Sequence, residues 1–221
     1  GNLRIGMGAR ATQVSRINNP WLEKQIQREQ QNLGQAETKA DALARVEQVY
    51  NEQGTKGLNH QLNEFFNSFR ELSNTPESLA SRTMVRETAS TLVQTFKNMN
   101  KELKNVQTDL DGQVKTSVDE INQFTKEIAQ LNEKIQLVEI QNVPANDERD
   151  RRDILLKKLG DKIDITWGES TNGMLTITAG NTAILVSGTS SNELKATHTD
   201  ARDRVEIFFK SNEKGSLFNV T

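Results

Sequence analysis

Side chains capable of catalysis or metal binding are few and scattered in this sequence. It contains no cysteine, and its two histidines, His60 and His198, are far apart and lack the HExxH spacing of zinc-binding helices. Acidic pairs such as Asp119-Glu120 lie among lysines and arginines, which is typical of a solvated helix face rather than of general acid–base catalysis. Because an active site needs reactive groups that converge, the sequence predicts no catalytic, cofactor-binding or metal-binding residue.

A weaker enzyme hypothesis concerns the C-terminal quarter of the chain. If a polar cleft exists anywhere, we expect it in the region 162–221. The side chains available there are Trp167, Asp164, Glu169 and His198. Nothing in their spacing matches a known catalytic arrangement, so an enzyme is the third and most distant interpretation.

The charge balance excludes several partners. There are 28 basic and 30 acidic residues, for a net charge of -2, which gives no reason to expect nucleic acid or an anionic membrane as a partner. The arginines Arg149, Arg151 and Arg152 are offset by neighbouring acids and form no cationic patch. No apolar run approaches the roughly 20 residues of a membrane span.

One very long helix organises the chain. Between Pro76 and Asn142 there is no second proline and only one glycine, Gly112. Apolar residues recur at intervals of four and three from Val85 to Leu110, the pattern of a helix that lies along another helix. The repeat slips between Leu110 and Val118, which predicts a bend or a change of packing partner beside Gly112.

Shorter elements flank this helix. Proline, glycine and asparagine boundaries predict helices over about 20–53, 58–72, 76–142 and 147–159. From residue 162 the apolar period changes to two, and Asn172-Gly173 predicts a β-hairpin. We expect a mainly α fold: an elongated antiparallel helical bundle (1–161) followed by a small antiparallel β region (162–221) that is truncated.

The apolar stripe predicts packing residues of two kinds. We expect an intramolecular core formed by Phe65, Phe66, Phe69, Leu92, Phe96 and Leu103. Beyond the slip, the stripe has more length than the two preceding helices can cover. We therefore expect a seam that faces an additional partner, formed by Ile121, Ile128, Leu131 and Ile135. In this chain, that partner is either another copy or part of the C-terminal sheet.

Five stretches in the same order carry a resemblance to a known family. They are VSRINNPWLEKQI (14–26), LNEFFNSFRELSNTPESLAS (62–81), VDEINQFTKEIAQLNEKI (118–135), NDERDRRDILLKKL (146–159) and LVSG (185–188). Together they resemble the flagellar hook-associated proteins of the hook–filament junction, the FlgK family, over nearly the whole chain. Flagellin and the second junction protein share the same helical plan.

The resemblance implies a structural subunit and no enzyme. Such proteins are exported by the flagellar type III route to the extracellular flagellum, with an export chaperone that binds a terminal region absent from this chain. They form a ring of copies that contacts hook protein on one side and the adjacent junction protein or flagellin on the other. The resemblance implies an internal fragment that lacks the terminal inner-core segments.

One alternative follows from the heptad pattern alone. A coiled-coil interaction or signalling module would use the slip at 110–118 to transmit a change of register. Symmetric pairing of parallel helices from two chains would favour that module, whereas helices folding back within one chain would favour the junction subunit.

Overall fold

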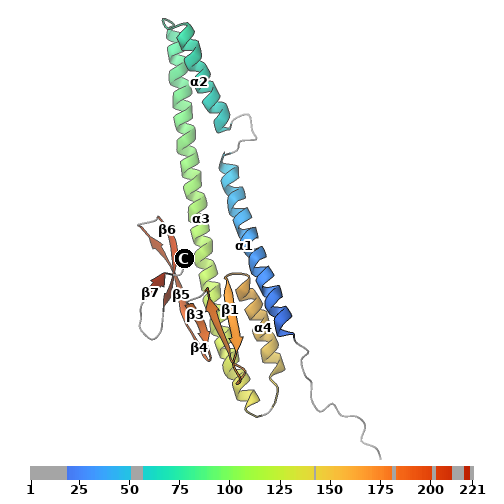
Figure 1. Cartoon of the computed structure of the whole chain (residues 1–221). Helices are drawn as coiled ribbons and strands as arrows, with labels where there is room; N and C mark the ends of the chain where they lie inside the picture. Colours follow the sequence, from blue (N-terminus) through green and yellow to red (C-terminus); the bar gives the residue numbers. More distant parts are fainter. Residues whose placement is uncertain are drawn as a thin grey trace, which may run out of the picture. The chain divides into compact units, whose positions relative to one another are not determined.

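The structure, a computed structural model, describes residues 19–50, 57–141, 143–180, 183–200, 203–210 and 217–219 (Figure 1). Four helices come first: α1 (Pro20–Tyr50), α2 (Leu58–Asn74), α3 (Leu79–Glu139) and α4 (Asn146–Gly160). Strands follow: β1 (Ile165–Glu169), β2 (Leu175–Ala179), β3 (Ala183–Ser187), β4 (Ser190–Ser191), β5 (Glu193–Thr199), β6 (Arg204–Lys210) and β7 (Leu217–Asn219). The predicted mainly α class, with one very long helix and antiparallel strands near the C-terminal end, is confirmed. Residues 11–17, whose mixture of β-branched and polar side chains favours an extended strand, lie outside the described residues.

The helix boundaries follow local capping. At the start of α1 the Leu22 amide donates to the Asn19 side-chain oxygen, 3.3 Å away. The long helix begins at Leu79 rather than at Pro76, because Ser78 occupies the capping position and accepts a hydrogen bond from the Ser81 amide (3.2 Å). α3 then runs without a break past Gly112.

α2 and α3 fold back on each other as an antiparallel hairpin. The Ser68 and Thr88 hydroxyl groups, 20 residues apart, lie 2.9 Å from each other at its middle. Thr75 and Ser81 make a second hydroxyl contact of 2.9 Å close to the turn. The hairpin therefore pairs residues whose numbers sum to about 156, which fixes the height of each side chain along it.

The strands form two small antiparallel sheets, in the orders β1-β2-β3-β4 and β5-β6-β7. β1 pairs with β2 so that Trp167 faces Ile177 and Glu169 faces Leu175. The predicted Asn172-Gly173 turn joins them, with Gly173 in the left-handed region at φ +78°. The sequence also predicts strands over 183–186 and 205–210, which correspond to β3 and β6, but it predicts none at β4 and β5.

Residues group into two compact units that do not follow the predicted division at 161/162. The first comprises Gly1–Asn32, Val118–Lys195 and Ile207–Thr221, and the second comprises Leu33–Ser117 and Ala196–Glu206. The difference arises because the first sheet packs on α3 and α4 instead of forming a separate domain. α3 contributes to both units, and the division falls at residues 117/118, where the heptad slip ends.

The most completely buried side chains belong to the first unit. They come from the last third of α3, from α4 and from β1, β2 and β3. The largest apolar ones are Ile128, Ile135, Leu159, Leu175, Ile177, Leu185 and Val186.

Candidate functional site

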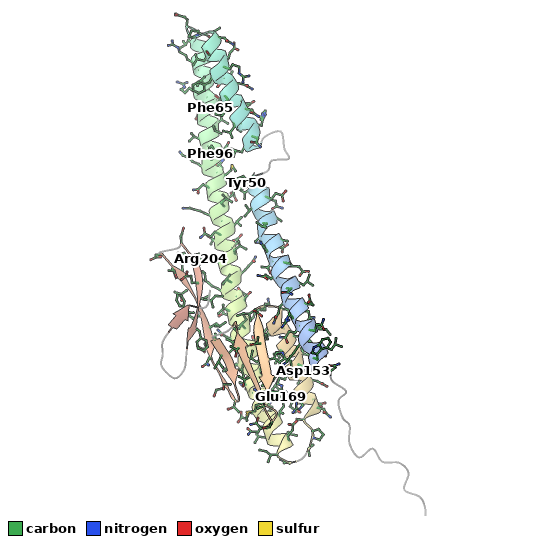
Figure 2. All side chains as sticks on the ribbon, viewed as in Figure 1. Tyr50, Phe65, Phe96, Asp153, Glu169 and Arg204 are labelled. Carbon is green, nitrogen blue, oxygen red and sulfur yellow. The ribbon has the colours of Figure 1, made fainter. Side chains whose placement is uncertain are left out.

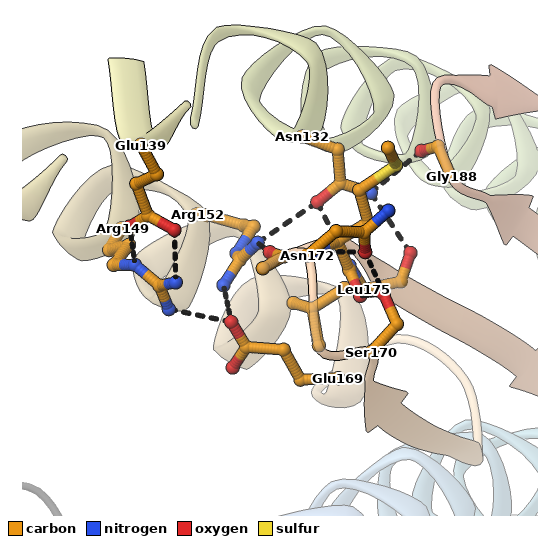
Figure 3. Close-up of polar contacts among 11 residues, drawn as sticks. Asn132, Glu139, Arg149, Arg152, Glu169, Ser170, Asn172, Leu175 and Gly188 are labelled. Atoms are coloured by element: carbon orange, nitrogen blue, oxygen red, sulfur yellow. Dashed lines mark hydrogen bonds and ion pairs between the residues drawn. The ribbon is translucent and has the colours of Figure 1, made fainter. Parts of the chain in front are cut away.

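Asn132 of α3 holds the first sheet against the helices by a full set of hydrogen bonds (Figure 3). Its side-chain amide donates to the carbonyls of Leu175 (2.9 Å) and Gly188 (2.7 Å). Its oxygen accepts from the Leu175 amide (3.1 Å) and from Arg152 Nη1 (3.0 Å). The side chain is 0% exposed, so these partners replace all the water that the amide would otherwise bind.

A second asparagine of α3 binds the next strand in the same way. Asn122 donates to the Leu194 carbonyl (2.9 Å) and accepts from the Leu194 amide (2.8 Å). Each of these two side-chain amides thus bonds both the backbone N–H and the backbone C=O of one strand residue, as a neighbouring strand would. These bonds fix the positions of β5 and β2 along α3.

Two arginines of α4 extend this polar junction to the turn between β1 and β2 (Figure 3). Arg152 is 1% exposed and donates from Nη1 to the Gly173 carbonyl (2.6 Å) and from Nη2 to Glu169 (3.3 Å). Burial lowers the pKa of Arg152 by disfavouring its charged form, and the charge of Glu169 opposes that effect. Its Nε–H has no partner. The hydrogen bonds from Arg152 to Gly173 and Glu169 of the β1–β2 hairpin therefore compensate for the water that this cation loses on burial.

Arg149 ties three elements together on the partly exposed side of the junction. It binds both oxygens of Glu139, at 2.6 and 2.9 Å, and donates from Nη1 to Glu169 at 2.6 Å. The hydrogen bonds from Arg149 lower the pKa of Glu139, and those to Glu139 raise the pKa of Arg149. A Cβ on Gly173 would lie 2.7 Å from Glu139 Oε2 and 2.9 Å from Arg149 Nη2, so the turn approaches this ion pair closely.

Sequence reasoning missed Asn132, although a signal for it was present. Ile128, Leu131 and Ile135 are buried on the same face of α3, and Asn132 occupies an equivalent position among them. A polar residue within an apolar stripe indicates a buried hydrogen-bonding partner.

The residues considered for catalysis do not come together. His198 lies near Asp200 and Asp203 (3.9 and 3.6 Å). Trp167 Nε1 donates to Gln27 of α1 (2.5 Å), while Glu169 accepts hydrogen bonds from the arginines of α4. His60 contacts Glu64 one turn along α2, at 3.3 Å. Within the described residues there is no group of three or more His, Asp or Glu that could hold a metal. None of the helices described here is long and apolar enough to cross a membrane.

The predicted core residues of the α2–α3 hairpin divide into two groups. Leu92 is buried, and Phe65 and Leu103 are half-buried. The Phe65 ring makes edge contacts with Phe66 and Phe69, at centroid distances of 5.5 and 4.9 Å. The expectation that Phe66, Phe69 and Phe96 are also core is wrong, since they are 60%, 47% and 49% exposed. They lie on a flank of the hairpin that no other described element covers.

The predicted partner-facing seam is the opposite case. Ile121, Ile128, Leu131 and Ile135 are all buried within this chain. No open seam remains there, because the first sheet and α4 lie on that face, as the contacts of Asn132 and the closeness of Ile135 to Gly173 show. Of the covers considered, part of the sheet is the one found, and the expectation that this face needs another chain is wrong.

Comparison with known proteins settles the family. Residues 43–220 match the model of the flagellar hook-associated protein FlgK helical domain. The chain belongs to the FlgK family. Flagellar hook-associated protein 1 of Bacillus subtilis (strain 168) is 32% identical over 191 residues, which cover 86% of this chain and 36% of that protein. The Escherichia coli (strain K12) protein of the same name is 25% identical over 199 residues, 89% of this chain and 36% of that protein.

A solved structure agrees with the fold. The flagellar hook junction protein FlgK from Burkholderia pseudomallei superposes with a TM-score of 0.72 at 22% identity, over 86% of this chain and 36% of that one. The chain thus spans about a third of the length of the FlgK relatives that it matches. At this identity the likeness establishes the arrangement of helices and strands.

Proposed function

We propose that this chain forms part of a structural subunit at the junction between the bacterial flagellar hook and filament. The observation that carries the proposal is the match of residues 43–220 to the FlgK helical domain. The relatives are named as flagellar hook-associated proteins, and they match 86% and 89% of this chain.

The mechanism that fits this role is mechanical. Asn122, Asn132 and Arg152 fasten two strands and a turn to α3 through buried hydrogen bonds. Such a network gives way only when several polar groups lose their partners at once, so the first unit resists distortion under load. The subunit acts by holding its shape and by packing against neighbours, without bond chemistry.

The partners follow from the same proposal. They are other copies in a ring, hook protein, and the adjacent junction protein or flagellin, with an export chaperone that binds outside this chain. The location is the extracellular flagellum, reached by the flagellar type III route. The signalling alternative is not favoured, because α2 and α3 pair antiparallel within one chain.

Immunogold electron microscopy tests the proposal. Antibodies raised against this chain are applied to intact flagella of the source organism, and to hook-basal bodies from which the filament has been removed. We expect a narrow band of gold at the distal end of the hook. Label along the whole filament would indicate a flagellin, and label on the cell body alone would refute the proposal.

A further inference from the structure

Most exposed large apolar side chains of the α2–α3 hairpin lie on one of its two faces. We use the name aromatic face for Phe66 and Phe69 of α2 together with Val93 and Phe96 of α3, all of them exposed. The hairpin and Phe96 can be found in Figure 2.

Helix geometry places these four residues together. Each residue advances about 100° around a helix. Ser68 marks the side of α2 that faces α3. From Ser68, in one rotational sense around the α2 axis, Phe69 lies at about 100° and Phe66 at about 160°. Counted from Leu92, Phe96 lies about 40° and Val93 about 100° around α3, in the same rotational sense.

When each helix of an antiparallel pair is viewed along its own chain direction, the same sense of rotation away from the contact reaches the same face of the pair. The Ser68–Thr88 contact also sets their heights, because it places Phe66 beside residue 90 and Phe69 beside residue 87. Thus the four side chains lie within about three turns of one another.

The two faces of the hairpin carry opposite charge. Arg82, Arg86 and Lys97 flank the aromatic face, at about 80° to 140° in that same rotational sense from Leu92. Glu64 and Glu71 of α2 lie on the other side of Ser68, at about 40° and 60° in the opposite sense. Met84 of α3 is 59% exposed and shares this second face, which we name the acidic face. Along the hairpin, the residues of the acidic face lie level with residues 84 to 92 of α3. The aromatic face and the bases beside it lie level with residues 82 to 97, so the two faces overlap in height.

We propose that the aromatic face of one copy packs on the acidic face of a second copy, side by side and at the same height. This inference rests on the proposed function and adds which surfaces meet. An exposed apolar cluster with a charged rim is typical of a protein interface. The rim of one face is basic and the other face is acidic, so copies attract in this arrangement, whereas two aromatic faces would bring like charges together.

The arrangement is heterologous. Each copy offers one face of each kind, so a second copy leaves one face of each kind open for further copies. Such contacts build a ring or a helical row and cannot end at a symmetric dimer. The contact uses only residues of the second unit and requires no change in the buried polar junction.

Because the chain contains no cysteine, single cysteines can report this contact without background. Glu64→Cys lies at the height of residue 92 and Val93→Cys beside it on the opposite face, and both positions are exposed. The two variants are mixed at high protein concentration, oxidised mildly, and resolved by mass on a non-reducing gel with one variant carrying a size tag. We expect the mixed disulfide to exceed either same-site disulfide several-fold.

Matched controls separate charge from folding. Lys101→Cys, exposed at the outer side of α3, replaces Val93→Cys in a parallel mixture and should give no excess of mixed product. Arg86→Glu, added to the Val93→Cys chain, should reduce the mixed product several-fold, because Arg86 is exposed and lies level with Glu71. Glu71→Lys in the Glu64→Cys chain should then restore the product. Circular dichroism confirms that each variant keeps its helix content.

Two outcomes overturn the inference. A dominant Val93–Val93 disulfide would mean a symmetric contact through the aromatic face. No excess of any product would mean that a different segment or partner covers this face. Neither outcome changes the result of the immunogold experiment, so a failure here leaves the junction assignment standing and is distinguishable from its failure.

Discussion

Asn132→Leu tests whether the buried asparagine holds the first sheet to α3. Leucine has the branched outline of asparagine, although its side chain is larger, and it removes the donors and the acceptor of the amide. Three buried groups then lose a partner: the Leu175 amide, the Leu175 carbonyl and Arg152 Nη1. The Gly188 carbonyl is half-buried and can bind water instead.

The expected cost follows from these three groups. Each buried polar group left without a partner costs about 1–3 kcal/mol. Burial of the new leucine returns about 2 kcal/mol. We therefore expect the free energy of unfolding to fall by about 4 kcal/mol, the middle of the range of about 1–7 kcal/mol that these figures give.

Urea unfolding monitored by tryptophan fluorescence provides the assay. The indole of Trp167 lies in the same unit and donates to Gln27, so its emission reports loss of the contact between β1 and α1. Asn105→Leu is the matched control, an exposed asparagine of the same helix whose change should stay within about 0.5 kcal/mol. If Asn132→Leu costs no more than this control, the amide does not hold the sheet and the reasoning is refuted.

Two further predictions concern the turn and the ion pair beside it. Gly173→Ala should lower the free energy of unfolding by more than about 1 kcal/mol, because φ is +78° and the new Cβ meets Glu139 and Arg149, whereas the open site of Gly168→Ala should show little change in a urea titration. Arg149 lowers the pKa of Glu139 in the folded state, so this pair stabilises the fold above the ordinary glutamate pKa of about 4.3 and loses that contribution as pH falls below it. Glu139→Gln should therefore show a smaller drop in thermal midpoint between about pH 6 and pH 3, and an unchanged drop would contradict the pairing.

The sequence predicted elements whose local pattern is strong. The heptad intervals of α3 and the Asn172-Gly173 turn both depend on neighbours within a few residues, and the structure has both. β5 escaped prediction because its residues, ELKATHT, alternate weakly and only Leu194 is buried. Its place in the fold depends on Asn122, 72 residues away, and no local period records that contact.

The same limit explains the reversed assignments along α3. The heptad pattern marks an apolar face from Leu92 to Ile135, but it does not identify what covers that face. After residue 118 the cover is the first sheet with α4, which buries Ile128 and Ile135. Before residue 100 the cover is the single 17-residue helix α2, which carries large side chains on its own flank and leaves Phe96 and Phe66 exposed. The same helix therefore has a fully covered apolar face at one end and a partly exposed one at the other. How much of its apolar face is buried depends on the width of the element that packs against it.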